Sequence, residues 1–171
     1  MDSFKCSSWI DFEKWIGYVD VKSTPTHFYV QKESNFSTKG TPIPFEIEKL
    51  NIGGAMNLSS GIFTAPRPGT YFFSFIGAAW FSPSSTYLAP LGVGLFLNGD
   101  QVGLGYVQEQ NTATSYQWHP FSVQSTLHLK AGDEISLQIT LSDAKSLLND
   151  SGNHHNHFTG WLVKEDIAHS L

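Results

Sequence analysis

Two consecutive segments alternate apolar and polar residues with a period of two, and this pattern limits what the chain can fold into more than any other feature. From Phe121 to Leu129 every second residue except Ser125 is apolar, with polar residues between. After Ala131-Gly132-Asp133 the same alternation runs from Ile135 to Leu141. A period of two is typical of strands with one buried face. The spacing therefore predicts two half-buried strands joined as an antiparallel hairpin.

Further strand signals follow along the chain. Asn98-Gly99-Asp100 supplies the positive φ angles of a tight turn, which predicts a hairpin between residues 91–97 and 101–106. Residues 71–81 are apolar on both parities, so we expect that strand to be covered on both sides. Short strands are also expected at residues 27–31, 43–50, 62–65 and 157–164. No sustained helical periodicity follows residue 24, so the fold class is all-β, a two-sheet sandwich or jelly roll.

Length and composition restrict the class of protein. The 171 residues fit one domain, and 40% apolar against 15% charged residues suffice for a core without disulfides. The lone Cys6 cannot form an internal bridge. A net charge of -5 argues against nucleic acid as a partner. No apolar run reaches the roughly 18 residues of a membrane span, and no secretory signal peptide is visible at the N-terminus.

The chain divides into three parts. Residues 1–24 form an aromatic N-terminal extension, residues 25–167 the globular domain and residues 168–171 a tail. Within the extension, apolar residues between Trp9 and Tyr18 are compatible with a short amphipathic helix. They are equally compatible with an arm that packs on the sandwich or on a neighbouring chain. Both readings of the extension stay open.

A pattern of aromatic residues and glycines carries a family resemblance. It consists of Phe45, Asn51, Gly61, Phe63, Pro66, Gly69, Tyr71, Phe73 and Phe75. This arrangement resembles the signature of the complement component 1q (C1q) globular-head family, with Met56 where that family usually has an aromatic residue or Leu. Leu97-Asn98-Gly99, residues 129–133 and residues 157–162 resemble the family as well. The resemblance extends from about residue 26 to residue 165.

The resemblance implies a ten-stranded jelly roll of the tumour-necrosis-factor-like type, assembled as a compact homotrimer. It also implies an extracellular, secreted location and no required cofactor, with calcium as a possible ligand. The strand that is apolar on both faces and the pair Gly92 and Gly94 suit close approach of neighbouring sheets or subunits. We therefore assign to the core or the subunit interface Tyr71, Phe73, Phe75, Gly92, Gly94, Phe158 and Gly160.

Two loops carry candidate metal ligands. His154, His155 and His157 have a spacing that can supply two ligands to zinc or copper, especially across a three-fold axis. The alternatives are a solvated loop whose imidazoles titrate near pH 6.5 or a pH sensor. Calcium-binding relatives use loop oxygens, and Asp143 is the best calcium ligand here. Asp133 is better explained as a turn former after Gly132.

Loop aromatics and glycosylation triplets complete the candidate sites. Tyr116 and Trp118 can stack on sugar rings in a lectin-like site, or lie partly buried at a loop base or subunit contact. Asn35 and Asn149 each begin an N-glycosylation triplet in a predicted loop. Motifs of hydrolases, metalloproteases and phosphate-binding enzymes are absent from the sequence. No catalytic residue is predicted.

These observations favour a non-enzymatic extracellular recognition module. We expect a trimer that binds proteins or microbial surface carbohydrate by avidity, in keeping with a role in innate immunity. A receptor ligand of tumour-necrosis-factor type is one alternative, and a structural or matrix assembly protein is another. The expected partners are the chain itself and an extracellular protein or carbohydrate, with no nucleic acid and no membrane span.

Overall fold

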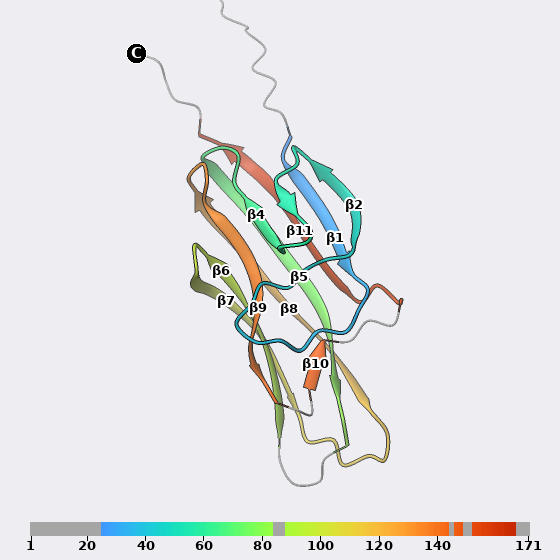
Figure 1. Ribbon diagram of the computed structural model, residues 1–171. Coiled ribbons are helices and arrows are strands. Elements are labelled where there is room, and N and C mark those ends of the chain that lie inside the picture. Colours follow the sequence, from blue (N-terminus) through green and yellow to red (C-terminus); the bar gives the residue numbers. More distant parts are fainter. Residues whose placement is uncertain (1–24, 84–87, 144–145, 149–151, 167–171) are drawn as a thin grey trace, which may run out of the picture.

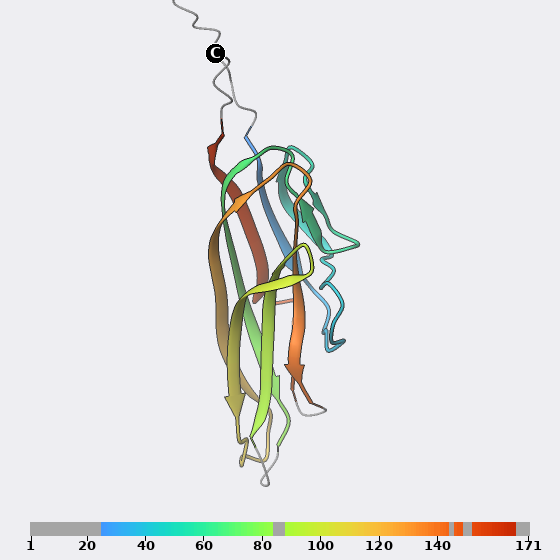
Figure 2. The same cartoon turned by 90° about the vertical axis from the view of Figure 1, so that its left-hand side faces the viewer.

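The computed structural model describes residues 25–83, 88–143, 146–148 and 152–166, which form two antiparallel sheets packed face to face (Figure 1). Seen from the side, the molecule is elongated along its strands (Figure 2). The strands are β1 (His27–Lys32), β2 (Ile47–Ile52), β3 (Met56–Asn57), β4 (Ile62–Thr64), β5 (Gly69–Phe81), β6 (Ala89–Leu97), β7 (Asp100–Glu109), β8 (Gln117–Leu129), β9 (Glu134–Ser142), β10 (Ser146–Leu148) and β11 (Asn156–Glu165).

The two sheets have six and five strands. In the first, β5 lies between β8 on one side and β11 and β10 on the other, and β1 and β2 continue beyond β11. The second has the order β3-β4-β9-β6-β7. The expected all-β jelly roll is confirmed. The described residues contain eleven strands rather than the expected ten. Two of these are very short: β3 has two residues and β10 has three.

The predicted hairpin between residues 121–129 and 135–141 is wrong. Both segments are strands, but β8 pairs with β5 in the six-stranded sheet, whereas β9 pairs with β4 and β6 in the five-stranded sheet. The turn at Gly132 carries the chain from one sheet to the other. Two hydrogen bonds to Ala65 hold it: the Ala65 N–H donates to the Asp133 carbonyl, and the Gly132 N–H donates to the Ala65 carbonyl, each at 2.8 Å. Alternating apolar and polar residues require that one face of each strand is buried. Two strands in facing sheets meet this requirement as well as two strands of a hairpin do.

The predicted hairpin of β6 and β7 is confirmed. Asn98 and Gly99 have φ angles of 52° and 90°, as a tight turn between twisted strands requires. The Asn98 side chain also joins this turn to the next one, because its Nδ2 donates to Asp133 Oδ1 at 3.0 Å and its Oδ1 accepts from the Glu134 N–H at 2.8 Å. The hydrogen bonds from Asn98 and from the Lys130 N–H lower the pKa of Asp133.

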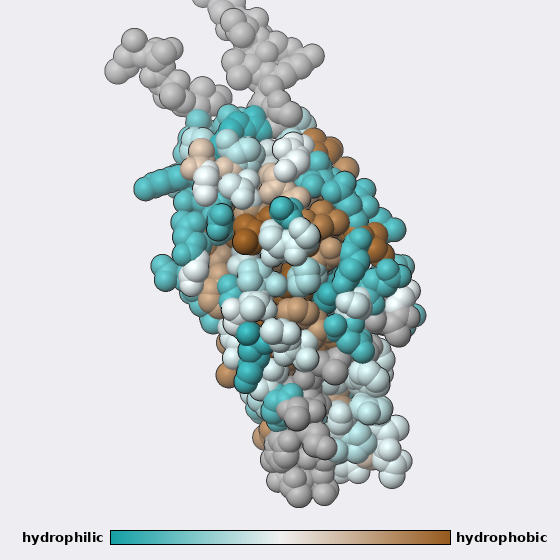
Figure 3. All heavy atoms as spheres, viewed as in Figure 1, coloured by the Kyte–Doolittle hydropathy of each residue, from teal (hydrophilic) through white to brown (hydrophobic). Residues whose placement is uncertain are grey.

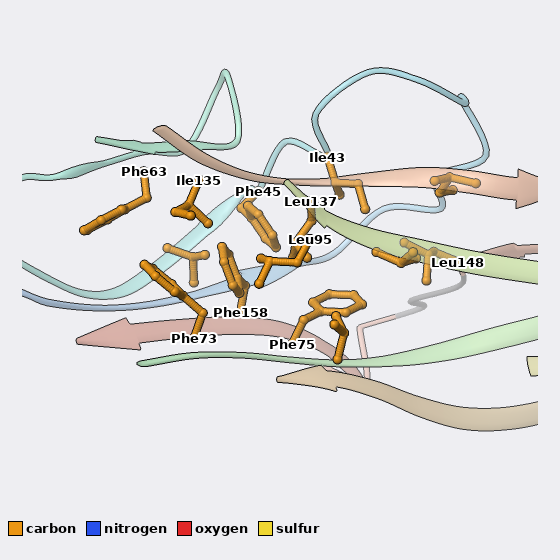
Figure 4. Packing of buried hydrophobic residues seen from close by; sticks show 14 of the residues in the cluster. Ile43, Phe45, Phe63, Phe73, Phe75, Leu95, Ile135, Leu137, Leu148 and Phe158 are labelled. Carbon is orange, nitrogen blue, oxygen red and sulfur yellow. The ribbon is translucent and has the colours of Figure 1, made fainter. Parts of the chain in front are cut away.

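The core between the sheets is rich in phenylalanine (Figure 4). Phe73 and Phe158 extend from the six-stranded sheet toward Phe63 and neighbouring residues of the opposite side. The ring centroids of Phe63 and Phe73 lie 5.4 Å apart in an edge-to-face arrangement, which aromatic quadrupoles favour. Tyr71 is also buried, and its hydroxyl donates to the Arg67 carbonyl at 2.8 Å. The core thus fixes the inward face of β5.

The glycines assigned to close contacts lie on different surfaces. Gly160 of β11 faces the core, where a Cβ atom would lie 2.5 Å from Cδ1 of Phe73. Gly92 and Gly94 of β6 lie beneath side chains of neighbouring strands of their own sheet; a Cβ on Gly92 would lie 3.2 Å from Cβ of Leu141. Gly160 therefore allows rings to pack against the strand, and a subunit contact at Gly92 and Gly94 stays a prediction.

Candidate functional site

The outward face of β5 is not covered by the other described residues. Strand parity directs Phe72 and Ile76 away from the core, and Ile76 is 40% exposed. Within the described residues, the prediction that this strand is covered on both sides is therefore not met, because there the six-stranded sheet packs against a second layer on one side. Its other side presents apolar side chains to solvent. Cover by a neighbouring chain or by the N-terminal extension stays a prediction.

Three aromatic rings form a row across this face, and we call them the aromatic row: His27, Phe72 and Trp161. Register places them side by side on β1, β5 and β11. The Trp161 centroid lies 4.6 Å from that of Phe72 and 5.9 Å from that of His27. Trp161 nevertheless stays 38% exposed. A hollow of about 470 Å³ adjoins the row and is lined by Pro25, Thr26, His27, Trp161, Val163 and Glu165.

A second group of rings lies at the other end of the same sheet, and we call it the aromatic corner: Trp80, Tyr116, Trp118 and His155. Trp80 stacks on Trp118 with centroids 5.6 Å apart and lies 4.2 Å from the Tyr116 ring. His155 meets Trp118 edge-on at 5.8 Å. Trp118 and Tyr116 are 42% and 51% exposed. The structure thus brings together Tyr116, Trp118 and His155, which the sequence singled out separately.

A hollow of about 460 Å³ opens beside the aromatic corner. Its lining residues are Ala78, Trp118, His119, Pro120, Asn153 and His155. Its volume lies within the roughly 300–1,000 Å³ that small-molecule sites occupy. None of these lining residues carries a carboxylate, an ammonium or a guanidinium group. The hollow is therefore apolar, with imidazole and amide groups at its edge.

Two buried asparagines hold the chain on either side of the corner, and the sequence analysis missed both. Asn111 Nδ2 donates to the carbonyls of Phe81 and Ser115, each at 2.9 Å, which ties the loop before Tyr116 to the end of β5. Asn156 Oδ1 accepts from the Ala78 N–H at 2.9 Å, which ties the chain after His155 to the same strand. Asn in turns was a usable signal for Asn111, whereas the burial of Asn156 depends on tertiary contacts.

The candidate metal ligands do not form a cluster. His157 lies 5.6 Å from the Tyr29 ring, while His155 faces Trp118 and His154 adopts a φ of 58°. Within the described parts of the chain, no group of three or more His, Cys, Asp or Glu is placed to hold a metal ion. Metal binding stays a prediction.

The remaining predicted positions lie apart from both aromatic groups. Asn35 is exposed in the loop after β1, and its glycosylation stays a prediction. Asn149, the extension of residues 1–24 and the tail of residues 168–171 lie outside the described residues. Among residues that the structure does describe, no helix has the length and apolarity to cross a membrane.

An ion pair between a buried lysine and an exposed glutamate, near the same loop, has a structural explanation. Lys32 is buried, and its ammonium donates to Glu46 Oε1 at 2.7 Å. Partial burial raises the pKa of Glu46, but hydrogen bonds from Lys32, Ser34 and the Glu33 N–H outweigh it and lower that pKa overall. The pair fixes the loop between β1 and β2, which crosses the middle of the molecule in Figure 1. On that side of the surface, apolar patches alternate with hydrophilic residues (Figure 3).

Comparisons with known proteins agree with this architecture. The family model of the C1q domain matches residues 27–163. Complement C1q tumor necrosis factor-related protein 2 from human is 31% identical over 143 residues, which cover 84% of this chain and 46% of that protein. The mouse protein of the same name is 31% identical over 139 residues, which cover 81% of this chain and 43% of that protein. The chain thus matches less than half the length of these relatives.

A solved structure with the same fold is the globular domain of zebrafish complement 1qA protein. It superimposes with a TM-score of 0.61 at 16% identity, covering 82% of this chain and 99% of that domain. At this identity the likeness establishes the fold. Together with the family match over most of the chain, these findings show that the chain belongs to the C1q domain family.

Proposed function

We propose that the protein is a non-enzymatic extracellular recognition module whose globular domain assembles into a homotrimer. The trimer binds proteins or microbial surface carbohydrate through several weak contacts at once. Three linked sites raise the apparent affinity well above that of one site, because the second and third contacts are intramolecular. A role in innate immunity follows if the ligand is microbial.

The aromatic row is the observation that carries the assembly. Large aromatic rings that stay partly exposed on a sheet face, beside an apolar hollow, mark an interaction surface. The row joins β1, β11 and β5 on the outward face of the six-stranded sheet. Ile76 continues the apolar surface along β5.

Light scattering in solution tests the assembly. We expect a mass three times the 19.0 kDa of one chain. The double variant Phe72→Ser plus Trp161→Ser should give a folded monomer, since it removes the two largest rings of the row. The matched control is Leu104→Ser plus Tyr106→Ser, which changes two exposed apolar residues of the five-stranded sheet and should leave the trimer intact.

The outcomes separate the assembly from its alternatives. A wild-type chain that is monomeric in every buffer would overturn the trimer. A mass that falls in the control and not in the row variant would place the contact on the other sheet. Repeating the measurement with EDTA tests calcium: dissociation would make the ion part of the assembly, and an unchanged mass would remove it from the proposal.

A further inference from the structure

We propose that the aromatic corner binds an uncharged sugar unit, with Trp118 as the stacking platform. The inference rests on the proposed recognition function and names the ligand class and the residues that contact it. It uses the end of the sheet opposite the aromatic row. Phe72 and Trp80 are eight residues apart on β5, or about 26 Å along the strand. Assembly through the row and ligand binding at the corner therefore use opposite ends of the same sheet face.

The platform is supported by ring contacts within the chain. Trp80 lies against both Trp118 and Tyr116, with centroids 5.6 and 4.2 Å away, and supports their inner sides. The outer sides of both rings stay exposed, at 42% and 51%. Aromatic side chains fixed by packing offer large contact areas at a small cost in conformational entropy. The exposed rings are therefore ready to receive a flat apolar surface, such as the C–H face of a pyranose.

The backbone on both sides of the corner is held as well. Asn111, 2% exposed, ties the loop that presents Tyr116 to the end of β5. Asn156, fully buried, ties the segment that follows His155 to Ala78. Buried amides that satisfy backbone groups give loops a defined geometry. The two asparagines act here as positioning residues.

The chemistry of the hollow selects against charged ligands. Its lining offers Trp118, Pro120 and Ala78 as apolar surface and His119, Asn153 and His155 as polar groups, with no Asp, Glu, Lys or Arg among them. Oε2 of Glu109 lies 3.2 Å from Nε2 of His119, so an acidic group borders this lining. The whole chain carries a net charge of -5. Polyanions such as phosphorylated or sulfated polymers find no basic surface here. A neutral hexose, with one apolar face and hydroxyls at its rim, matches rings beside amide and imidazole groups.

Titration of the full-length protein with glucose, mannose and galactose tests the proposal by tryptophan fluorescence and calorimetry. We expect saturable binding of at least one neutral hexose in the millimolar range. Dextran sulfate serves as the anionic probe and should not bind at the corner. Trp118→Ala should weaken hexose binding at least tenfold, as loss of a central aromatic contact does. Trp118→Phe should retain part of the affinity because it keeps a ring.

Matched variants guard against a general loss of structure. Tyr106→Ala removes an exposed ring, 46% exposed, from the other sheet and should leave hexose affinity unchanged. His155→Ala changes an exposed residue, so it should fold normally and still weaken binding. Asn111→Asp, a positioning variant, should weaken hexose binding while Trp118 stays in place.

Measuring the solution mass of every sample separates this inference from the assembly. A trimer that binds none of the three hexoses, or binds one equally after Trp118→Ala and His155→Ala, overturns the sugar site and leaves the assembly standing. A monomer that binds a hexose through Trp118 overturns the assembly and leaves the sugar site standing. Binding of dextran sulfate that Trp118→Ala abolishes would overturn the uncharged ligand class.

Discussion

The two faces of β5 both carry aromatic side chains but have opposite surroundings. Tyr71 and Phe73 point inward and are completely buried. Phe72 and Ile76, on the alternate parity, point outward, where Ile76 is 40% exposed. Both faces therefore carry apolar side chains, and among the described residues only the inward face has a partner layer.

This difference separates residues that stabilise the fold from residues that are available for function. Shortening an inward ring removes its packing contacts and leaves a cavity, so it lowers the free energy of unfolding of the monomer. An outward ring makes fewer contacts within the chain, so shortening it changes association more than folding. The predictions below test whether the two faces divide in this way.

The largest effect is expected for Phe73→Ala. Phe73 is fully buried against Phe63 and Phe158, and removing the ring should lower the free energy of unfolding by about 3–5 kcal/mol. Denaturant unfolding of a dilute sample measures the change. Phe72→Ala is the control from the opposite face, and an equal loss in both variants would contradict the division.

Adding one methyl group to the core-facing side of β11 should lower stability somewhat less than Phe73→Ala does. A Cβ on Gly160 would lie 2.5 Å from Cδ1 of Phe73 and 2.7 Å from Cε1 of Phe28, with both rings packed in the core. Gly160→Ala should therefore lower stability by about 2–3 kcal/mol through overpacking. Gly92→Ala, where the Cβ would contact partly exposed side chains of the other sheet, should cost less. Thermal unfolding of the two variants tests the order.

Lys32 is a charged residue on the inner face of β1, and the stability of the protein should depend on the acidic partner of its ammonium group. Lys32 is buried beside Glu46, so Glu46→Gln should lower stability by about 1–2 kcal/mol by leaving a buried ammonium poorly compensated. Because the pKa of Glu46 is lowered in the folded protein, its contribution is complete above the ordinary value of 4.5. It is lost as pH falls through the lowered pKa.

Denaturant unfolding at a series of pH values measures this dependence. The wild-type protein should lose stability below pH 4.5, and the difference between it and Glu46→Gln should shrink over the same interval. A difference that stays constant as the pH falls would show that the charge of Glu46 does not contribute.

The smallest change in the stability of the single chain is expected on the outer face. Ile76→Ala should alter monomer stability by about 1 kcal/mol or less, because that side chain is partly in solvent already. In the wild type, the unfolding midpoint should rise with protein concentration if the face is covered by other copies. The variant should show a weaker rise, and a concentration-independent wild type would contradict self-association.

Nine of the eleven described strands were predictable because each has a local signal, whereas the short strands β3 and β10 were not predicted. The turn at Asn98 and Gly99 specified the hairpin of β6 and β7, and alternation located β8 and β9. The pairing of β8 and β9 was not predictable in the same way. Alternation reports that one face is buried without reporting whether the partner lies beside the strand or across the core.

For the candidate site too, the individual residues were predictable from the sequence and their arrangement was not. Tyr116, Trp118 and His155 were visible in the sequence as loop residues of unusual type. Their meeting with Trp80 was not visible, because these residues come from segments up to 75 positions apart and converge through strand pairing and two buried asparagines. Burial of an asparagine has no local sequence signal, since it arises from backbone groups of distant segments.

The sequence by itself determined the fold class, the positions of most strands, the buried parity of the alternating strands and the family, because turns, periodicity and fixed aromatic spacing act locally. The tertiary structure alone decided which sheet each strand enters, which of the two apolar parities of β5 faces the core and which aromatic rings stay in solvent. Those outcomes depend on contacts between distant segments. One face of β5 is buried and the other exposed because a second sheet covers a single side of it.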